Sequence, residues 1–324
     1  MTPKLQSSLP VRPRERRHVT IVAGFRSYQG IVLCADTQET VANISKRNVP
    51  KLIFQPSVYA IQTQAVHADE LAVAFCGAAD NGPFVDKLVE NAWEDAQIGS
   101  SLDEVCLLIE GSIKKTYREY GQIYQTGYCP SADLIYGVKM FRSSKLFSAS
   151  GPIVNEKKTF YSGGAGYYMA DFLASRMYHD GMNLRQCVIL AAYILFQAKE
   201  HVEGCGGDSQ IAILRDDGVS GKVDWVSVEA INKMIRWEDV ELGRLILDAA
   251  DLEISKKEFL ERAKTAAELA ASMRDIEKAE YVANRVTQQH GYGWMLDGGE
   301  EPESKLDEYG LPTPLDSRMS TDQK

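Results

Sequence analysis

Three residues near the start of the chain carry side chains that could act together in nucleophilic catalysis. Thr20 opens a run of strand-forming residues (TIVAGF), Asp36 closes a second run (IVLCAD), and Lys51 opens a third. A threonine hydroxyl is a weak nucleophile until a base takes its proton, and the free α-amine of a first residue, with a pKa of roughly 8, can be that base. A Lys51 ammonium would lower the pKa of such an amine by repulsion between like charges, and Asp36 would hold that ammonium in place. Each residue alone also has an ordinary structural explanation, so only the combination points to chemistry.

The intervening segments predict antiparallel strands followed by pairs of helices. The first two runs surround a turn-like tetrapeptide, Ser27-Tyr28-Gln29-Gly30, which is typical of a β-hairpin. Further strands are expected at 51–54, 57–62, 69–76, 133–141, 145–150, 159–161, 209–214 and 222–227. Helices are expected after 81–83 and at 101–120, 166–179, from Asn183, 238–248 and 255–286. Runs of strands followed by runs of helices indicate an α+β fold rather than alternating βαβ units.

The composition excludes several function classes. The 324 residues include 36 basic and 45 acidic side chains, a net charge of −9, and lack the basic footprint that nucleic-acid binding needs. No apolar run approaches the ~18 residues of a membrane helix, and the first residues are polar and basic, unlike a signal peptide. We therefore expect a cytoplasmic protein with no nucleic-acid partner and no membrane partner.

The cysteines and histidines favour buried thiols over metal ligation. The six cysteines include no C-x-x-C pair, and most lie in apolar runs, which is typical of free thiols in a reducing compartment. Neither they nor the five histidines have the spacing of zinc ligands. The sequence therefore predicts no metal and no cofactor.

Five separated segments carry a family resemblance. They are TIVAGFR with GIVLCADT (20–26 and 30–37), NVPKL (48–52), CGAAD (76–80), GAGY (164–167) and GGDSQIAIL (206–214). In the same order, these segments resemble motifs of proteasome β subunits and of the related bacterial HslV-type proteases. No one segment would suffice, but their common order makes the chain similar to this family over about residues 18–228.

The resemblance implies a four-layer αββα sandwich of the N-terminal nucleophile hydrolase type with a C-terminal helical extension. It implies Thr20 as the nucleophile after leader removal, with Asp36 and Lys51 as catalytic partners. The backbone N–H of Gly77, or of an adjacent residue, would stabilise the oxyanion. It also implies a peptide or protein substrate and a homo-oligomeric or ring assembly. Because the chain has no G-x-x-x-x-G-K-(S/T) motif, an ATPase unfoldase would be a separate protein.

Four regions follow from this reading. Residues 1–19 form a flexible leader or propeptide, 20–230 the proteasome-like domain, 231–296 a helical extension, and 297–324 an acidic tail expected to be disordered.

Departures from the family pattern keep other functions open. Val19 stands where self-cleaving relatives usually have Gly, and its β-branched side chain stiffens the bend that self-cleavage needs. Ala165, Val202 and Cys205 replace the family's Ser, Asp and Ser, and Gln38 replaces an Arg that is less general. Three readings therefore remain: a threonine peptidase, a non-catalytic proteasome-like subunit, and an amide hydrolase acting on a non-peptide substrate.

Overall fold

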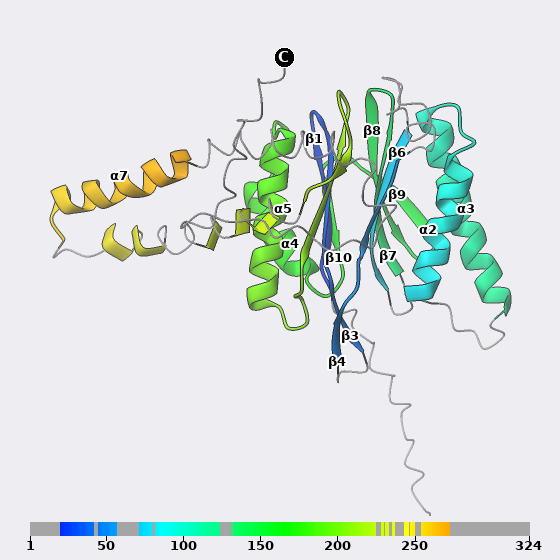
Figure 1. The fold of residues 1–324 in the computed structure, drawn as a ribbon, viewed down its shortest axis with the longest axis horizontal. Helices are drawn as coiled ribbons and strands as arrows, with labels where there is room; N and C mark the ends of the chain where they lie inside the picture. Colours follow the sequence, from blue (N-terminus) through cyan, green and yellow to red (C-terminus); the bar gives the residue numbers. More distant parts are fainter. Residues whose placement is uncertain are drawn as a thin grey trace, which may run out of the picture. The chain divides into compact units, whose positions relative to one another are not determined.

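Figure 1 shows the computed structural model of the chain, in which residues 20–41, 45–56, 71–79, 82–123, 130, 132–224 and 254–272 and parts of 228–249 are described. The chain divides into two units, Met1–Val223 and Asp224–Lys324. The expected leader, the expected tail and the expected strand at 57–62 lie outside the described residues.

The first sheet is built around the hairpin expected from the sequence. Its strand order is β10-β1-β2-β11-β12, and every pairing is antiparallel. The strands are β1 (Val22–Ser27), β2 (Gly30–Asp36), β10 (Phe160–Gly163), β11 (Ser209–Arg215) and β12 (Gly221–Lys222). Gly30 is required at the turn, because its φ is 144° and a Cβ there would lie 2.0 Å from the carbonyl oxygen of Leu214.

The second sheet has the order β5-β6-β7-β8-β9 and is also antiparallel. Its strands are β5 (Leu52–Pro56), β6 (Leu71–Ala79), β7 (Ala132–Met140), β8 (Ser143–Ser150) and β9 (Ile153–Lys157). A separate two-stranded ribbon of β3 (Gln38–Val41) and β4 (Ser45–Asn48) connects the two sheets along the chain. The sequence did not predict β3, β4 or β9, because these strands are short and mostly polar.

Two helix pairs contact the two sheets. The helices α4 (Tyr167–Met177) and α5 (Leu184–His201) pack on the first sheet, and α2 (Gly82–Ala96) and α3 (Leu102–Ile123) pack on the second. The sheets contact each other through β1 and β2 on one side and β6 and β7 on the other. The fold is therefore α+β with antiparallel sheets, as the sequence predicts.

Apolar side chains fill the spaces between these elements. One buried cluster lies between the sheets and includes Val22, Leu33, Ala74, Ile135 and Leu146. A second cluster joins the second sheet to α2 and α3; it includes Phe75, Phe84, Ile109, Tyr136 and Phe147. These clusters explain why the strand segments are nearly continuous runs of apolar residues.

The helix-capping patterns are confirmed in full at one helix and in part at another. Asn183 caps α5: its side chain accepts the Gln186 N–H, and the Gln186 side chain accepts the Asn183 N–H. At α3 the Ser101 hydroxyl accepts the Glu104 N–H at 3.3 Å, but the Glu104 carboxylate turns to the N–H and hydroxyl of Ser100.

The second unit contains a helix, α7 (Lys256–Ser272), where the sequence predicts one at 255–286. Ser255 caps it by accepting the Glu258 N–H. Arg262 binds both Asp248 and Glu258 within this unit. None of the helices in the described segments is long and apolar enough to cross a bilayer.

The close approach of the two sheets at Gly24 gives a stability prediction. A Cβ on Gly24 would lie within 2.9 Å of the side chains of Ile135, Leu33 and Leu146. Gly24→Val should therefore overpack the core and lower the free energy of unfolding by about 2 kcal/mol in urea denaturation. Gly111→Ala is the matched control, because a Cβ on this α3 residue meets nothing within 4 Å. The control should raise the free energy of unfolding by about 0.5–1 kcal/mol, and equal losses in both variants would contradict the packing argument.

Candidate active site

The two sheets bring Thr20, Asp36 and Lys51 together. Thr20 lies two residues before β1, Asp36 ends β2, and Lys51 comes directly before β5 in the other sheet. The register of the hairpin, with Val22 opposite Ala35, carries the start of β1 to the end of β2. The sequence therefore selected three residues that the fold makes neighbours.

Asp36 is the centre of the hydrogen-bond network. Its Oδ1 accepts the hydroxyl of Thr20 and the backbone N–H of Ile21, the latter at 3.2 Å. Its Oδ2 accepts the N–H of Gly206 at 2.9 Å. The carboxylate is 0% exposed, so these donors replace the water that the charged group loses on burial.

Lys51 completes the constellation from the second sheet. Its Nζ lies 2.8 Å from Asp36 Oδ1 and also donates to the hydroxyl of Thr20 and the carbonyl of Gln38. Only 10% of its side chain is exposed. Burial lowers the pKa of Lys51, and the negative charge of Asp36 opposes that effect. The arrangement thus holds an amine against the Thr20 hydroxyl and makes its neutral form more accessible than in a solvated lysine.

Gln210 on β11 fixes the backbone that leads to Lys51, and the sequence did not single it out. Its side-chain oxygen accepts the N–H groups of Lys51 and Leu52 at 2.9 and 3.1 Å. It is therefore a positioning residue that links the first sheet to the start of β5. Its place one residue into a predicted strand gave no signal of this role.

A turn of glycines supports Thr20 on its carbonyl side. The N–H of Gly166 donates to the Thr20 carbonyl at 3.0 Å. Gly164 has a φ of 80°, and a Cβ there would lie 2.4 Å from the same carbonyl oxygen. The GAGY segment is therefore a backbone cradle for Thr20 as well as the start of α4.

A second loop supports Asp36 from the other side. The N–H of Gln38 donates to the Gly206 carbonyl and the N–H of Asp208 donates to the Thr37 hydroxyl, at 3.0 and 2.7 Å. The Gln38 side chain donates to the Gly204 carbonyl at 2.8 Å. Gln38, a departure from the family pattern, thus holds this loop in place.

Of the remaining departures from the family pattern, Cys205 lies near the ion pair. Val202 and Cys205 are buried, and Glu203 is exposed. Burial raises the pKa of Cys205 to about 12, with Asp36 adding to the effect and Lys51 opposing it. At this pKa the thiol stays protonated near neutral pH, so Cys205 acts as a small apolar neighbour of the ion pair.

The backbone N–H of Gly77 already donates a hydrogen bond in this structure. It donates to the carbonyl of Lys51 at 3.2 Å, as part of the contact between β6 and the start of β5. Gly77 therefore contacts a residue of the site, but its N–H is paired rather than directed at Thr20. Its oxyanion role stays a prediction from the sequence.

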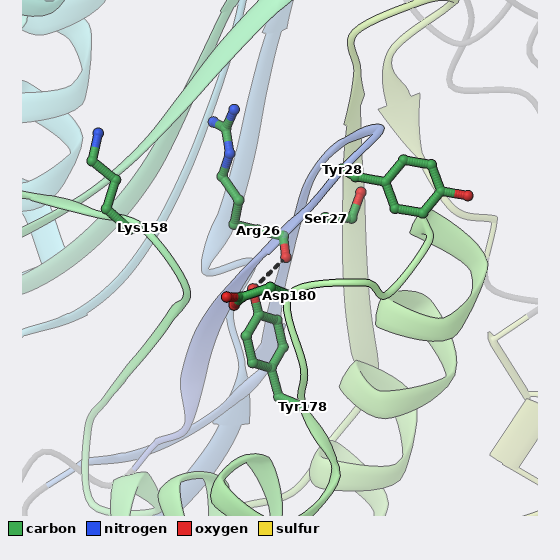
Figure 2. A pocket seen from close by; sticks show the side chains of 6 residues that line it. All are labelled: Arg26, Ser27, Tyr28, Lys158, Tyr178 and Asp180. Atoms are coloured by element: carbon green, nitrogen blue, oxygen red, sulfur yellow. Dashed lines mark hydrogen bonds between the residues drawn. The ribbon is translucent and has the colours of Figure 1, made fainter.

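A pocket elsewhere on the molecule has no part in this constellation. Figure 2 shows its lining, which comes from the end of β1 remote from Thr20, the turn before β10 and the segment after α4. The hydroxyl of Tyr178 closes one side by donating to the Arg26 carbonyl at 2.7 Å. The chemistry and the pocket thus lie at opposite ends of β1.

The cysteine prediction is confirmed where it can be followed. The five described cysteines, Cys34, Cys76, Cys106, Cys187 and Cys205, are buried and free, and Cys129 lies outside the described residues. Within the described segments, no group of three or more His, Cys, Asp or Glu side chains is arranged to hold a metal ion.

Comparison with known proteins shows which proteins have a similar fold. No protein-family model matches the chain. It is 28% identical over 191 residues to "Proteasome subunit alpha" of Methanothermobacter thermautotrophicus, covering 56% of this chain and 68% of the relative.

Solved structures of Anbu proteins share the architecture. Anbu from Hyphomicrobium sp. strain MC1 gives a TM-score of 0.53 at 17% identity, covering 73% of this chain and 99% of that one. Anbu from Yersinia bercovieri, described as an ancestral β subunit, gives 0.54 at 14% identity, covering 69% and 96%. The helical assembly of the Anbu complex from Pseudomonas aeruginosa gives 0.52 at 14% identity, covering 70% and 95%. The chain therefore has a proteasome-like fold.

The buried ion pair gives a prediction about stability. Asp36→Asn keeps the shape of the side chain but leaves the Lys51 ammonium without its counter-charge. Both oxygens of Asp36 accept from donors, so the NH₂ group of the asparagine would face a donor in either orientation. The free energy of unfolding should fall by about 3–5 kcal/mol, measured by urea denaturation at pH 7. The control, Glu39→Gln, breaks the exposed pair with Arg47 and should cost less than ~1 kcal/mol. Equal effects of the two variants would show that the Asp36 network is not a structural centre.

Proposed function

We propose that the chain is a proteasome-like threonine peptidase, with the four-layer αββα architecture of N-terminal nucleophile hydrolases, that acts after removal of residues 1–19. The observation that carries this proposal is the meeting of the Thr20 hydroxyl, the Lys51 Nζ and the Asp36 carboxylate at one buried point. A hydroxyl held against an amine and a carboxylate is the arrangement that activation of a nucleophile needs.

The proposed mechanism assigns each group a proton task. In the uncut chain Thr20 has no free amine, so the neutral form of Lys51 takes the hydroxyl proton while Thr20 Oγ1 attacks the carbonyl of Val19. The Val19–Thr20 C–N bond then breaks, its nitrogen takes the proton from Lys51 to become the α-amine, and water hydrolyses the ester to release the leader. In the cut chain this α-amine serves as the base for attack on a substrate amide, gives the proton to the leaving amine, and then activates the water that hydrolyses the ester. Lys51 and Asp36 then keep the pKa of that amine low and its position fixed.

The same proposal extends to partners. Relatives named as a proteasome subunit and as an assembled Anbu complex support a homo-oligomeric or ring assembly. We propose peptide or protein substrates in the cytoplasm, with any ATPase unfoldase supplied as a separate protein.

The competing candidate is a non-catalytic subunit of such an assembly. Two observations favour it: Thr20 is only 3% exposed, and Val19 precedes it in the chain. In that case the Lys51–Asp36 pair would serve only to join the two sheets.

The mature amino terminus decides between these candidates. A chain released from a cleavable fusion so that it begins at Thr20 should hydrolyse fluorogenic peptides, and Thr20→Ala should reduce the rate at least 10³-fold. Thr265→Ala, which removes an exposed hydroxyl on α7, should leave the rate unchanged. Intact-mass measurement of the full-length protein should show loss of the leader, faster in Val19→Gly.

Other results would redirect the assignment. A chain beginning at Thr20 that is folded, assembled and inactive on peptide and non-peptide amides would establish the non-catalytic subunit. Turnover of non-peptide amides alone, lost in Thr20→Ala, would establish the small-molecule hydrolase.

The pH profile tests the proton roles. Because burial lowers the pKa of Lys51 from 10.5, removal of the leader, in which neutral Lys51 is the base, should speed up with rising pH along a limb whose apparent pKa lies below that value. Lys51→Arg stays charged at every accessible pH, so this variant should lose that limb together with at least 10²-fold of the rate of leader removal. An unchanged profile in Lys51→Arg would exclude Lys51 from proton transfer.

A further inference from the structure

The pocket at the end of β1 remote from Thr20 is lined by charges of both signs. It has a volume of about 210 Å³. Its lining residues are Arg26, Ser27, Tyr28, Lys158, Tyr178 and Asp180. Figure 2 shows Lys158 and Tyr28 on opposite sides of the pocket, with Arg26 and Asp180 between them.

Two cations supply hydrogen-bond donors to this pocket. The Arg26 guanidinium donates through Nη1 to the Ser144 carbonyl, and its other nitrogens have no acceptor among the residues that the structure describes. The Lys158 ammonium is paired with Glu156, but 79% of the Lys158 side chain is exposed, so it keeps donors for a ligand. A guanidinium with unused N–H groups is suited to bind a carboxylate through two parallel hydrogen bonds.

Asp180 supplies the opposite charge. It is exposed in the segment after α4, and its carboxylate has no hydrogen bond or ion pair within the described segments. Figure 2 shows this carboxylate set apart from the ends of Arg26 and Lys158, which point the same way. Asp180 can therefore accept hydrogen bonds from a ligand ammonium group, away from the two cations.

The buried part of the lining is held in place by hydrogen bonds. The Tyr178 hydroxyl donates to the Arg26 carbonyl at 2.7 Å, and burial raises the pKa of Tyr178 to about 12, so this donor stays protonated. Ser27 is 3% exposed, and its Oγ accepts the Gln29 N–H at 3.0 Å. In the part of the chain that the structure describes, the Ser27 hydroxyl hydrogen has no acceptor. The pocket thus has a fixed wall that still offers a donor to a ligand.

We propose that this pocket binds a free α-amino acid with an apolar side chain. Arg26 and Lys158 bind its carboxylate, and Asp180 binds its ammonium group. The side chain of the amino acid contacts Tyr28, which is 63% exposed. The inference does not depend on whether Thr20 is catalytic, and its test measures no hydrolysis.

Both the charges and the size of the pocket favour this class of ligand. A bare anion would leave Asp180 unpaired beside it, and a simple amine would face two cations, whereas a zwitterion complements both signs. A water molecule occupies about 30 Å³ in the liquid, so the pocket has room for about seven molecules of that size. That is the size of a single amino acid rather than of a peptide.

Calorimetric titration of the full-length protein with matched ligands tests the two charges separately. L-leucine should bind saturably at millimolar concentrations. L-leucinamide lacks the carboxylate and N-acetyl-L-leucine lacks the ammonium group, so each should bind at least ~10-fold more weakly. Inorganic phosphate, which is an anion alone, should also bind at least ~10-fold more weakly than L-leucine.

Two variants assign the charges to residues. Asp180→Asn should weaken L-leucine at least ~10-fold and abolish the preference for L-leucine over N-acetyl-L-leucine. Lys158→Gln should reduce the preference for L-leucine over L-leucinamide. The control, Asp86→Asn, alters an exposed carboxylate on α2 and should leave binding unchanged. Thermal unfolding of all three variants should match that of the unaltered protein, because the three side chains are exposed.

Several results would overturn the proposal. One is the absence of L-leucine binding at millimolar concentrations. Another is binding of phosphate, N-acetyl-L-leucine or L-leucinamide as tight as that of L-leucine, which would show a site for a single charge. A third is unchanged L-leucine binding in Asp180→Asn.

Discussion

The ion pair between Lys51 and Asp36 is the interaction on which the rest of the site depends. Its two members come from different sheets, so it forms only when the sheets pack in the correct register. Its burial is costly, and the cost is offset by donors from Thr20, Ile21 and Gly206. Packing of the two sheets and assembly of the candidate site are therefore one event. A change that displaces either sheet alters the chemistry, and a change that removes either charge weakens the fold.

The surroundings of this ion pair are shielded from water and of low polarity. Cys205 lies near the pair as a protonated thiol. A low local polarity strengthens the attraction between Lys51 and Asp36 and at the same time disfavours the charged amine. Of these two opposed effects on Lys51, burial is the larger, so the pKa of its amine is lowered from that of a solvated lysine.

Local patterns predicted the parts of the structure that local physics decides. The hairpin of β1 and β2, the cap at Asn183 and the apolar strands of both sheets were readable because turn residues, capping side chains and buried runs each leave a signal in adjacent positions. The meeting of Thr20, Asp36 and Lys51 was anticipated from their places at strand ends and from the family resemblance.

Other parts of the structure could not be predicted from the sequence. The polar strands β3, β4 and β9 carry no apolar alternation. The Glu104 carboxylate accepts the N–H of Ser100 rather than that of Ser101, and the hydrogen bond of the Gly77 N–H depends on how β6 pairs with β5. The Gln210 contact joins residues 159 positions apart. Contacts of this kind depend on the tertiary structure, so a short segment of sequence does not predict them.

The amide of Gln210 has a consequence for how this chain can change over evolutionary time. One side-chain oxygen satisfies two consecutive N–H groups, so no smaller or apolar residue can replace it without leaving donors unpaired between the sheets. Substitutions at position 210 are therefore coupled to substitutions in the segment that carries Lys51, although the two segments are far apart in the sequence. Among divergent homologues we expect a glutamine lost at this position to be accompanied by a compensating change just before β5. A search profile built from paired positions of this kind would recognise distant members that the glycine and aspartate motifs alone would miss.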